Sequence, residues 1–475
     1  MMIGPKLYFL LLPFFALSKG FCQLPATSTD FEKNTLEAIR TRHVKDLNSL
    51  QGAYKKYLAD IYKERFDLIK NKFTNKEILV DHTAQAYLDR LTEKILLTNH
   101  LPEPKELRIL FSKSHLPNAS SMGEGTILFN IGLFHRLENE SQAAFVLCHE
   151  LAHYYLNHSN NSIDKYVTTV YSDEFQKQIK NIKKSEYGVN SQLEKLTRNL
   201  LFKNRRHSRE FEQSADSMAV ELMKNTGYDI KESLTCLALL DSVDKDKYHP
   251  QLNLEKIFNF SAFPFKKSWL EDDDLRFIGE KDEISKQDED SLKTHPECSL
   301  RIARLEKKVT DNYKTDSRKN LVSEVEFNNL RTAFDYQIID YAIQSNQVAR
   351  ALFLALEMLD EHPGDAKLQG MVGKCFNEIY KNQKSHTLST IVDLPGHGFN
   401  QSYNALLRLI QNLRLSEVAA LSYYFLKQHE NISINNEDFV AALITSKEHL
   451  GKEQERQQWV DFYQQKFPTG NHQFK

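Results

Sequence analysis

The feature that most constrains this chain is the pentapeptide His149-Glu150-Leu151-Ala152-His153, which follows a run of apolar residues. Histidines four positions apart on a helix lie on one face, about one turn apart, so both imidazoles can reach a single metal ion. Glu150 lies one position round from His149, where its carboxylate can act on a water at that ion. The pattern predicts a helix with two zinc ligands and a general base. Because such a short pattern also arises by chance, its context has to decide.

A catalytic zinc site needs a third protein ligand and an open position for water. The segment from Ser208 to Asp216 offers one, because Glu212 and Asp216 lie four positions apart on a helix that we expect over roughly residues 205–226. One carboxylate can complete a two-histidine, one-glutamate site while the other orients a histidine. An acidic pair on a helix is usually solvated surface, but the apolar residues around this pair favour a buried interface.

Four segments, in this order, resemble motifs of the M48 peptidases. They are Asn118-Ala119 followed by Gly125-Thr126-Ile127, the HExxH pentapeptide, the segment Ser208–Asp216 that reads SRxxExxAD, and His295-Pro296 followed by Arg301-Ile302. The resemblance covers about residues 77–310. It is closest to the soluble, exported members that carry a helical repeat domain, because the chain has no membrane-spanning stretch after its N-terminal segment.

The resemblance implies a role for each matched residue. His149, His153 and Glu212 would bind one Zn²⁺ per subunit. Glu150 would take a proton from the zinc-bound water and deliver it to the leaving amine. Asp216 would orient His149 or His153 without touching the metal. The strand that begins near Asn118 and Ala119 would add the substrate peptide along its edge by main-chain hydrogen bonds.

His295 has two interpretations of about equal weight. It can be a structural histidine before a proline, or it can lie on a loop that folds over the site. In the second case His295 would occupy the open zinc position and keep the enzyme latent. The acidic, irregular segment over about residues 245–293 is long enough to act as such a lid.

The chain divides into four regions by pattern. Residues 1–22 carry an early lysine, a short apolar stretch and small residues near Cys22, as a secretory signal peptide does. We expect cleavage near Cys22; lipid attachment at this cysteine is the less favoured alternative. Residues 23–76 form a helical arm, residues 77–312 the peptidase-like domain, and residues 325–475 a helical domain. The mature protein is then exported, either periplasmic or secreted.

The C-terminal region has a wholly helical pattern. A helix pair over residues 330–381 is interrupted by Pro363 at a period of about 34 residues, which resembles a tetratricopeptide repeat (TPR). A plain helical bundle that caps the peptidase is the alternative. The expected fold is therefore mainly α with a small β-sheet, a zincin-like metallopeptidase domain, followed by an all-α TPR-like domain.

Composition and charge narrow the possible functions. At 475 residues, with a formal net charge of −2 and a pI near 6.8, the chain has no electrostatic signature of nucleic-acid binding. The leading hypothesis is a zinc endopeptidase of exported or envelope proteins that binds a protein partner through its helical domain. Peripheral membrane association is possible. The alternatives are a chaperone or adaptor that works through the helical domain, and a fold in which zinc is only structural.

Overall fold

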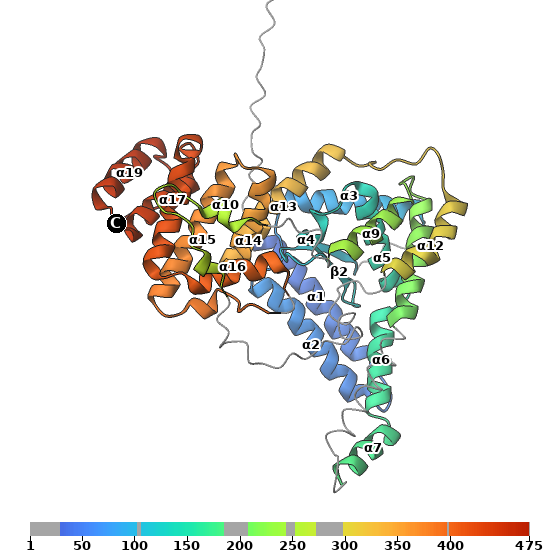
Figure 1. Ribbon diagram of the computed structural model, residues 1–475. Helices are drawn as coiled ribbons and strands as arrows, with labels where there is room; N and C mark the ends of the chain where they lie inside the picture. The colour runs from blue at the N-terminus through green and yellow to red at the C-terminus, as the bar shows by residue number, and fades with distance from the viewer. Residues whose placement is uncertain are drawn as a thin grey trace, which may run out of the picture.

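The computed structural model describes residues 29–101, 106–184, 208–243, 252–271, 298–396 and 399–474. The expected signal peptide lies outside these residues. Within them the chain is mostly helical with one small sheet, which confirms the fold class at this level (Figure 1). In the described part of the chain, no helix combines the length and the apolar character that crossing a membrane requires.

The sheet has three strands in the order β1-β3-β2. β1 (Arg108–Ser112) and β3 (Thr126–Asn130) are parallel, whereas β2 (Ala119–Ser121) is antiparallel to β3 and therefore lies at an edge. The apolar runs over residues 107–111 and 126–130 predict two strands, and the structure confirms both to within one residue. The sequence over residues 118–125 predicts a turn, which is corrected in part because this stretch contains β2.

Both faces of this sheet are buried. Ile109 and Phe129 face a core shared with α3 and α5, while Leu110 and Leu128 face α1 and α2. Burial on both faces explains why the strands read as continuous apolar runs rather than alternating ones. The helices of these layers are α1 (Thr29–Ser49), α2 (Lys55–Thr74), α3 (His82–Thr98) and α5 (Glu140–Tyr155).

Helix α5 occupies the centre of this half of the protein. Asn139 caps its start by accepting a hydrogen bond from the Gln142 amide, within the range Glu138 to Ser141 where the sequence predicts the helix to begin. From Glu140 to Ala152 all side chains except that of His149 are buried. A helix that is buried on nearly all sides must be surrounded by other elements, as α5 is.

The Glu140 carboxylate fastens the start of α5 to the C-terminal half. It accepts hydrogen bonds from the backbone amides of Leu321 (2.6 Å), Val322 (2.8 Å) and Ser323 (2.6 Å). The hydroxyls of Tyr87 and Tyr228 also donate to it. Glu140 is fully buried, so these donors supply the hydrogen bonds that water would otherwise give to the carboxylate.

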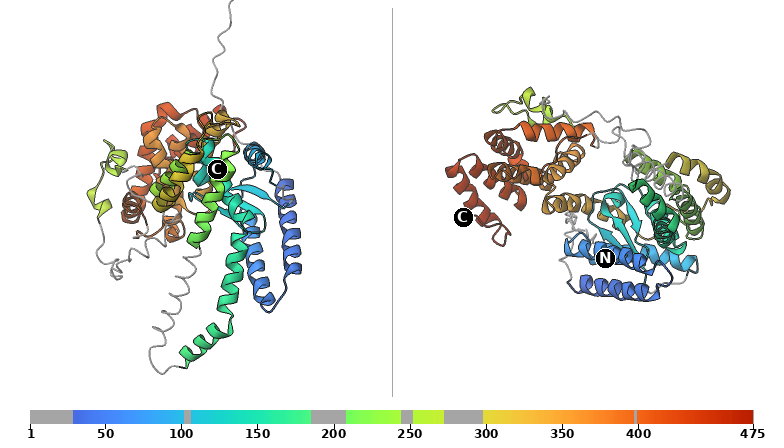
Figure 2. Two further views of the ribbon diagram at one scale, coloured as in Figure 1. Left: turned by 90° about the vertical axis from the view of Figure 1, so that its right-hand side faces the viewer. Right: turned by 90° about the horizontal axis from the view of Figure 1, so that it is seen from below.

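The helices that follow α5 carry the remaining parts of the site and an extension. They are α6 (His158–Val170), α7 (Asp173–Lys183), an unlabelled helix over residues 208–224, α9 (Glu232–Val243) and α12 (Cys298–Asn312). α6 runs alongside α2, and α7 extends beyond it at the end of the protein away from the sheet (Figure 2). The helix over residues 208–224 ends just before Gly227, whose φ of +85° is the left-handed conformation common after helix ends.

The C-terminal half consists of successive helices. They are α13 (Glu324–Gln344), α14 (Val348–Glu361), α15 (Ala366–Lys384), α16 (Gln401–Asn412), α17 (Leu415–Ser433), α18 (Glu437–His449) and α19 (Glu453–Lys466). α13 belongs to both cores. Phe327 and Phe334 pack into the core around α5, whereas Ile339 and Ala342 pack into the helical core. A single helix therefore joins the two halves.

Part of the segment expected to be irregular over about residues 245–293 is ordered. It forms α10 (Leu254–Phe258) and a short 3-10 helix, η2 (Lys267–Leu270). Phe258 and Trp269 are buried in the C-terminal helical core. The expectation of irregular structure is therefore wrong for these residues, because a few large apolar side chains are enough to fold a short segment onto a neighbouring core.

Replacement of Glu140 by alanine tests how far the fold depends on this carboxylate. The Glu140→Ala variant leaves three backbone amides and two hydroxyls without their acceptor, and we expect it to lose more than about 4 kcal/mol of the free energy of unfolding. Urea denaturation measures this loss. The matched control is Glu138→Gln, on an exposed residue just before the same helix, which is expected to change stability little. Equal midpoints for the two variants would contradict the role of Glu140.

Candidate metal centre

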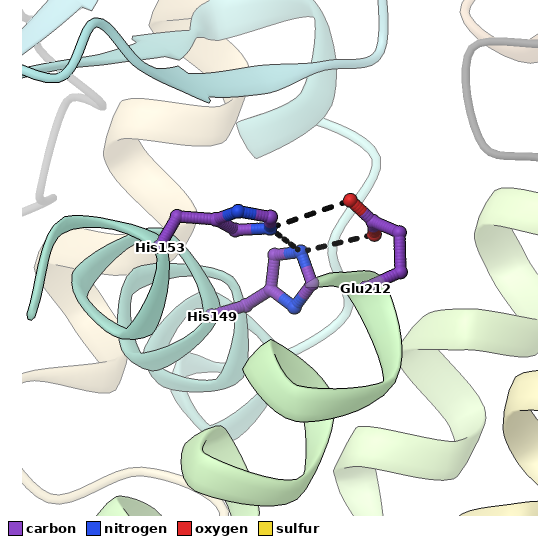
Figure 3. Close-up of side chains that lie close together, drawn as sticks. All are labelled: His149, His153 and Glu212. Atoms are coloured by element: carbon purple, nitrogen blue, oxygen red, sulfur yellow. Dashed lines mark hydrogen bonds and ion pairs between the residues drawn. The ribbon is translucent and has the colours of Figure 1, made fainter. Parts of the chain in front are cut away.

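Three side chains converge between α5 and the helix over residues 208–224 (Figure 3). Nε2 of His149 lies 3.0 Å from Nε2 of His153, and each lies 3.4 Å from a different carboxylate oxygen of Glu212. One ligand atom from each of the three residues lies within 4.8 Å of the others. The structure thus brings together the three residues that the sequence suggests as metal ligands.

Glu212 is an ionised carboxylate in this arrangement. Burial would raise its pKa, but the contacts with His149 and His153 hold the pKa well below its ordinary value. Arg301 also lies close, with Nη1 3.3 Å from Glu212 Oε2. An anionic oxygen ligand is therefore ready beside two imidazole nitrogens.

The three candidate ligands line a cavity of about 290 Å³. Its wall on one side is formed by Asn118 and the β2 residues, which are the residues suggested as a substrate-binding edge. Leu240 of α9 and Arg301 of α12 line other parts. β2 thus forms part of the wall of the cavity that contains the candidate ligands.

Glu150 also lines this cavity, on the side of β2. Burial raises the pKa of its carboxyl group, while the neighbouring histidines and a hydrogen bond with the Ser121 backbone act in the opposite direction. A carboxylate with a raised pKa is a stronger base than an ordinary exposed glutamate. Its position and environment therefore suit a group that accepts and returns a proton.

Asp216 lies behind His149 and not behind His153. Its Oδ1 lies 3.0 Å from Nδ1 of His149. Arg301 donates two hydrogen bonds of 2.7 Å to the two Asp216 oxygens, from Nε and Nη2. Burial alone would raise the pKa of Asp216, but the hydrogen bonds from Arg301 and the contact with His149 hold it below its ordinary value. Asp216 is thus a charged partner for the far side of one imidazole.

The sequence alone predicts a surface or packing role for His158 and gives no sign of its contact with His153. His158 begins α6 and is buried; its Nδ1 lies 3.0 Å from Nδ1 of His153. Arg301 was noted only as part of a motif, without its contact with Asp216. The spacing HExxH-x4-H is visible in the sequence, but only the turn between α5 and α6 brings the third ring back toward the second. That turn is made at Asn157, whose φ is +57°.

The structure does not describe the residue suggested to gate the site. His295 lies outside the described residues, and so do the acidic stretches that precede it. His135 lines a different cavity, where its Nδ1 lies 2.7 Å from Oδ1 of Asp335.

Comparison with known protein families covers the region that holds these residues. Residues 82–309 match the family model described as Peptidase family M48. This range contains the sheet, α5, the helix over residues 208–224 and most of α12. Among curated proteins, none matches the chain.

The Asp216–Arg301 pair gives a test of the buried network. In Asp216→Asn the guanidinium of Arg301 loses its bidentate partner in a buried position, so we expect a loss of about 3–5 kcal/mol in the free energy of unfolding. The double variant Asp216→Asn with Arg301→Met removes both charges, and most of the stability is expected to return. Urea unfolding of the single and double variants measures both effects. A double variant less stable than the single one would show that the ion pair is not the cause.

Proposed function

The chain carries a Peptidase M48 domain over residues 82–309, which implies a metallopeptidase, and we propose that it is a zinc-dependent endopeptidase. The observation that carries this proposal is the convergence of His149, His153 and Glu212, with one ligand atom each within 4.8 Å. A structural zinc site is usually closed by four protein ligands, whereas this set of three faces a cavity.

The donor set fits zinc. Two imidazole nitrogens and one carboxylate oxygen form the ligand set of many catalytic zinc sites, and all three lie on the rigid frame of two packed helices. When bound, Zn²⁺ would supply Lewis acidity, which lowers the pKa of water and polarises a peptide carbonyl. His149, His153 and Glu212 would hold it.

Glu150 performs the proton transfers in this proposal. Its carboxylate takes a proton from the attacking water as that water adds to the scissile carbonyl. The same group then returns the proton to the nitrogen of the leaving amine, so that the residue ends the reaction as a carboxylate. Burial, which raises its pKa, supports this role because a stronger base removes the proton more readily.

The edge of β2 would bind the substrate backbone, and the hydrogen-bond pattern identifies Ala119 as the pairing residue. Asn118 accepts a bond from the Asn130 amide, and Met122 donates one to Thr126. In an antiparallel pair such bonds fall on alternate residues, so Ala119 and Ser121 turn their N–H and C=O groups to the open edge.

Ser121 is already engaged on that edge. Its carbonyl accepts a hydrogen bond of 3.0 Å from Ser159 Oγ, and its backbone is hydrogen-bonded with Glu150. Ala119 therefore remains for the peptide, next to the catalytic base. Pairing through a single residue would hold the substrate in one register beside Glu150.

The substrates that we propose are exported or envelope proteins. The N-terminal sequence supports export, because residues 1–22 have the pattern of a signal peptide cleaved near Cys22. The helices α13 to α19 would form a TPR-like surface that binds a substrate or partner protein. Peripheral attachment to a membrane is compatible with this location.

A chaperone or adaptor role through the helical half is the second hypothesis. The intact arrangement of three ligands, base and charged partner favours catalysis over this alternative, since an adaptor has no need of a base that faces the cavity. A variant without the base separates the two hypotheses.

Glu150→Gln removes the base and retains the size of the side chain. We expect it to retain zinc and to lose peptidase activity by a factor of about 10²–10⁴, the usual contribution of a general base. The measurements are zinc content of the purified protein and cleavage of a fluorogenic peptide library. Chelator treatment should abolish wild-type activity and added zinc should restore it. A Glu150→Gln protein that retains the full cellular function of the wild type would favour the adaptor hypothesis.

Ala119→Pro tests the pairing with the substrate backbone. Proline removes the N–H that faces the open edge and leaves the bonds between β2 and β3 intact, as proline can on an edge strand. Loss of one hydrogen bond of about 0.5–1.5 kcal/mol should lower kcat/KM by about two- to tenfold. Ala119→Ser, which keeps the N–H, is the matched control and should resemble the wild type. Similar kcat/KM values for the two variants would contradict this mode of binding.

A further inference from the structure

His158 lies between a candidate zinc ligand and the helix that supplies the carboxylate ligand. Its Nδ1 lies 3.0 Å from Nδ1 of His153, and its Nε2 lies 3.1 Å from Oγ of Ser214. The His158 ring is stacked on Phe211, with ring centroids 4.4 Å apart and an angle of 18° between the planes. Ser214 and Phe211 belong to the helix over residues 208–224, as Glu212 does. One helix thus holds both the carboxylate and the ring of His158.

His153, His158 and Ser214 form a chain of hydrogen-bonded groups. When His153 binds a metal through Nε2, only one assignment of donors and acceptors along this chain is possible. The Nδ1 of His153 then carries the ring proton and donates it to Nδ1 of His158. Because Nδ1 of neutral His158 is then an acceptor, its Nε2 carries the proton and donates to Ser214.

The chain ends on backbone carbonyls. The Ser214 hydroxyl lies 3.0 Å from the carbonyl oxygen of Phe211 and 3.1 Å from that of Glu210, so it can donate to either. Every donor from His153 to the helix backbone therefore has an acceptor. This order of donors places the lone pair of His153 Nε2 on the side of His149 and Glu212.

We propose that His158 is a positioning residue for His153, which fixes the plane and the tautomer of this imidazole so that its Nε2 is directed at the metal. The inference rests on the proposed zinc peptidase function and adds a partner to the ligand set. The two ligating histidines then have partners of different charge. The Asp216 carboxylate lies 3.0 Å from Nδ1 of His149 as a charged neighbour, whereas His158 would accept from Nδ1 of His153 as a neutral ring.

Two substitutions at position 158 separate this role from simple packing. His158→Phe keeps an aromatic ring that can stack on Phe211 but has no acceptor. His158→Asn loses the ring but places its Oδ1 close to where Nδ1 was, so it can still accept from His153. The acceptor role predicts a zinc affinity 10–100-fold weaker for His158→Phe, and close to the wild type for His158→Asn. A packing role predicts the reverse order.

The experiment is competition between the full-length protein and a chelator of known affinity for Zn²⁺, with the thermal unfolding of the metal-free proteins as a check of folding. Equal zinc affinity for wild type and His158→Phe, or a weaker affinity for His158→Asn than for His158→Phe, would overturn the proposal. If the wild type itself bound no zinc, the proposed function would fail instead.

Ser214→Ala keeps the proposal testable if His158→Phe does not fold. This variant removes the acceptor of His158 Nε2 and leaves both rings in place. We expect zinc affinity to fall by several-fold, because the His158 tautomer is no longer fixed. Thr168→Ala, on an exposed residue of α6 whose hydroxyl donates to the Asp164 carbonyl and does not contact His158, is the control and should bind zinc as the wild type does. Unchanged affinity in Ser214→Ala would overturn the proposal.

Discussion

The burial of α5 is the constraint on which the rest of the structure depends. The helix must present His149, Glu150 and His153 to a cavity while the remaining side chains up to Ala152 are excluded from water. At the start of the helix, the buried Glu140 carboxylate accepts hydrogen bonds from the backbone amides of Leu321, Val322 and Ser323. These bonds satisfy the carboxylate and the three amides at the same time. The sheet, α3 and α9 then cover its sides.

The candidate metal centre is built from two helices that each perform two tasks. α5 supplies both imidazoles and the base. The helix over residues 208–224 supplies Glu212, which lies beside Nε2 of His149, and Asp216, which lies beside Nδ1 of the same ring. Phe211 and Ser214 of the same helix hold His158. Glu212, Asp216 and the residues that hold His158 therefore lie on one rigid helix. No one of them can shift without moving the others, so their positions relative to the two histidines are fixed together.

Periodicity in the sequence predicts most helices of the core and the strands β1 and β3, but it predicts neither β2 nor the choice of Glu212 over Asp216 as a candidate metal ligand. His149 and His153, like Glu212 and Asp216, are related by the four-residue repeat of a single helix, so local geometry decides their positions. The role of His158 could not be predicted in this way, because it depends on the left-handed turn at Asn157 and on a helix some fifty residues away. The burial of Trp269 was missed for the same reason: its partners lie in the C-terminal half.

Hydrogen bonds between residues far apart in the sequence also join the helical half to the helix that carries the candidate metal ligands. The amides of Leu321, Val322 and Ser323 bind Glu140, and Ser323 is also the N-cap of α13. α13 in turn packs into both cores through different residues. A movement of α13 relative to α5 must break hydrogen bonds to a buried carboxylate, which is costly. A protein segment held by the helical half would therefore be presented to Glu150 from a frame that moves with the site, not from a flexible tether.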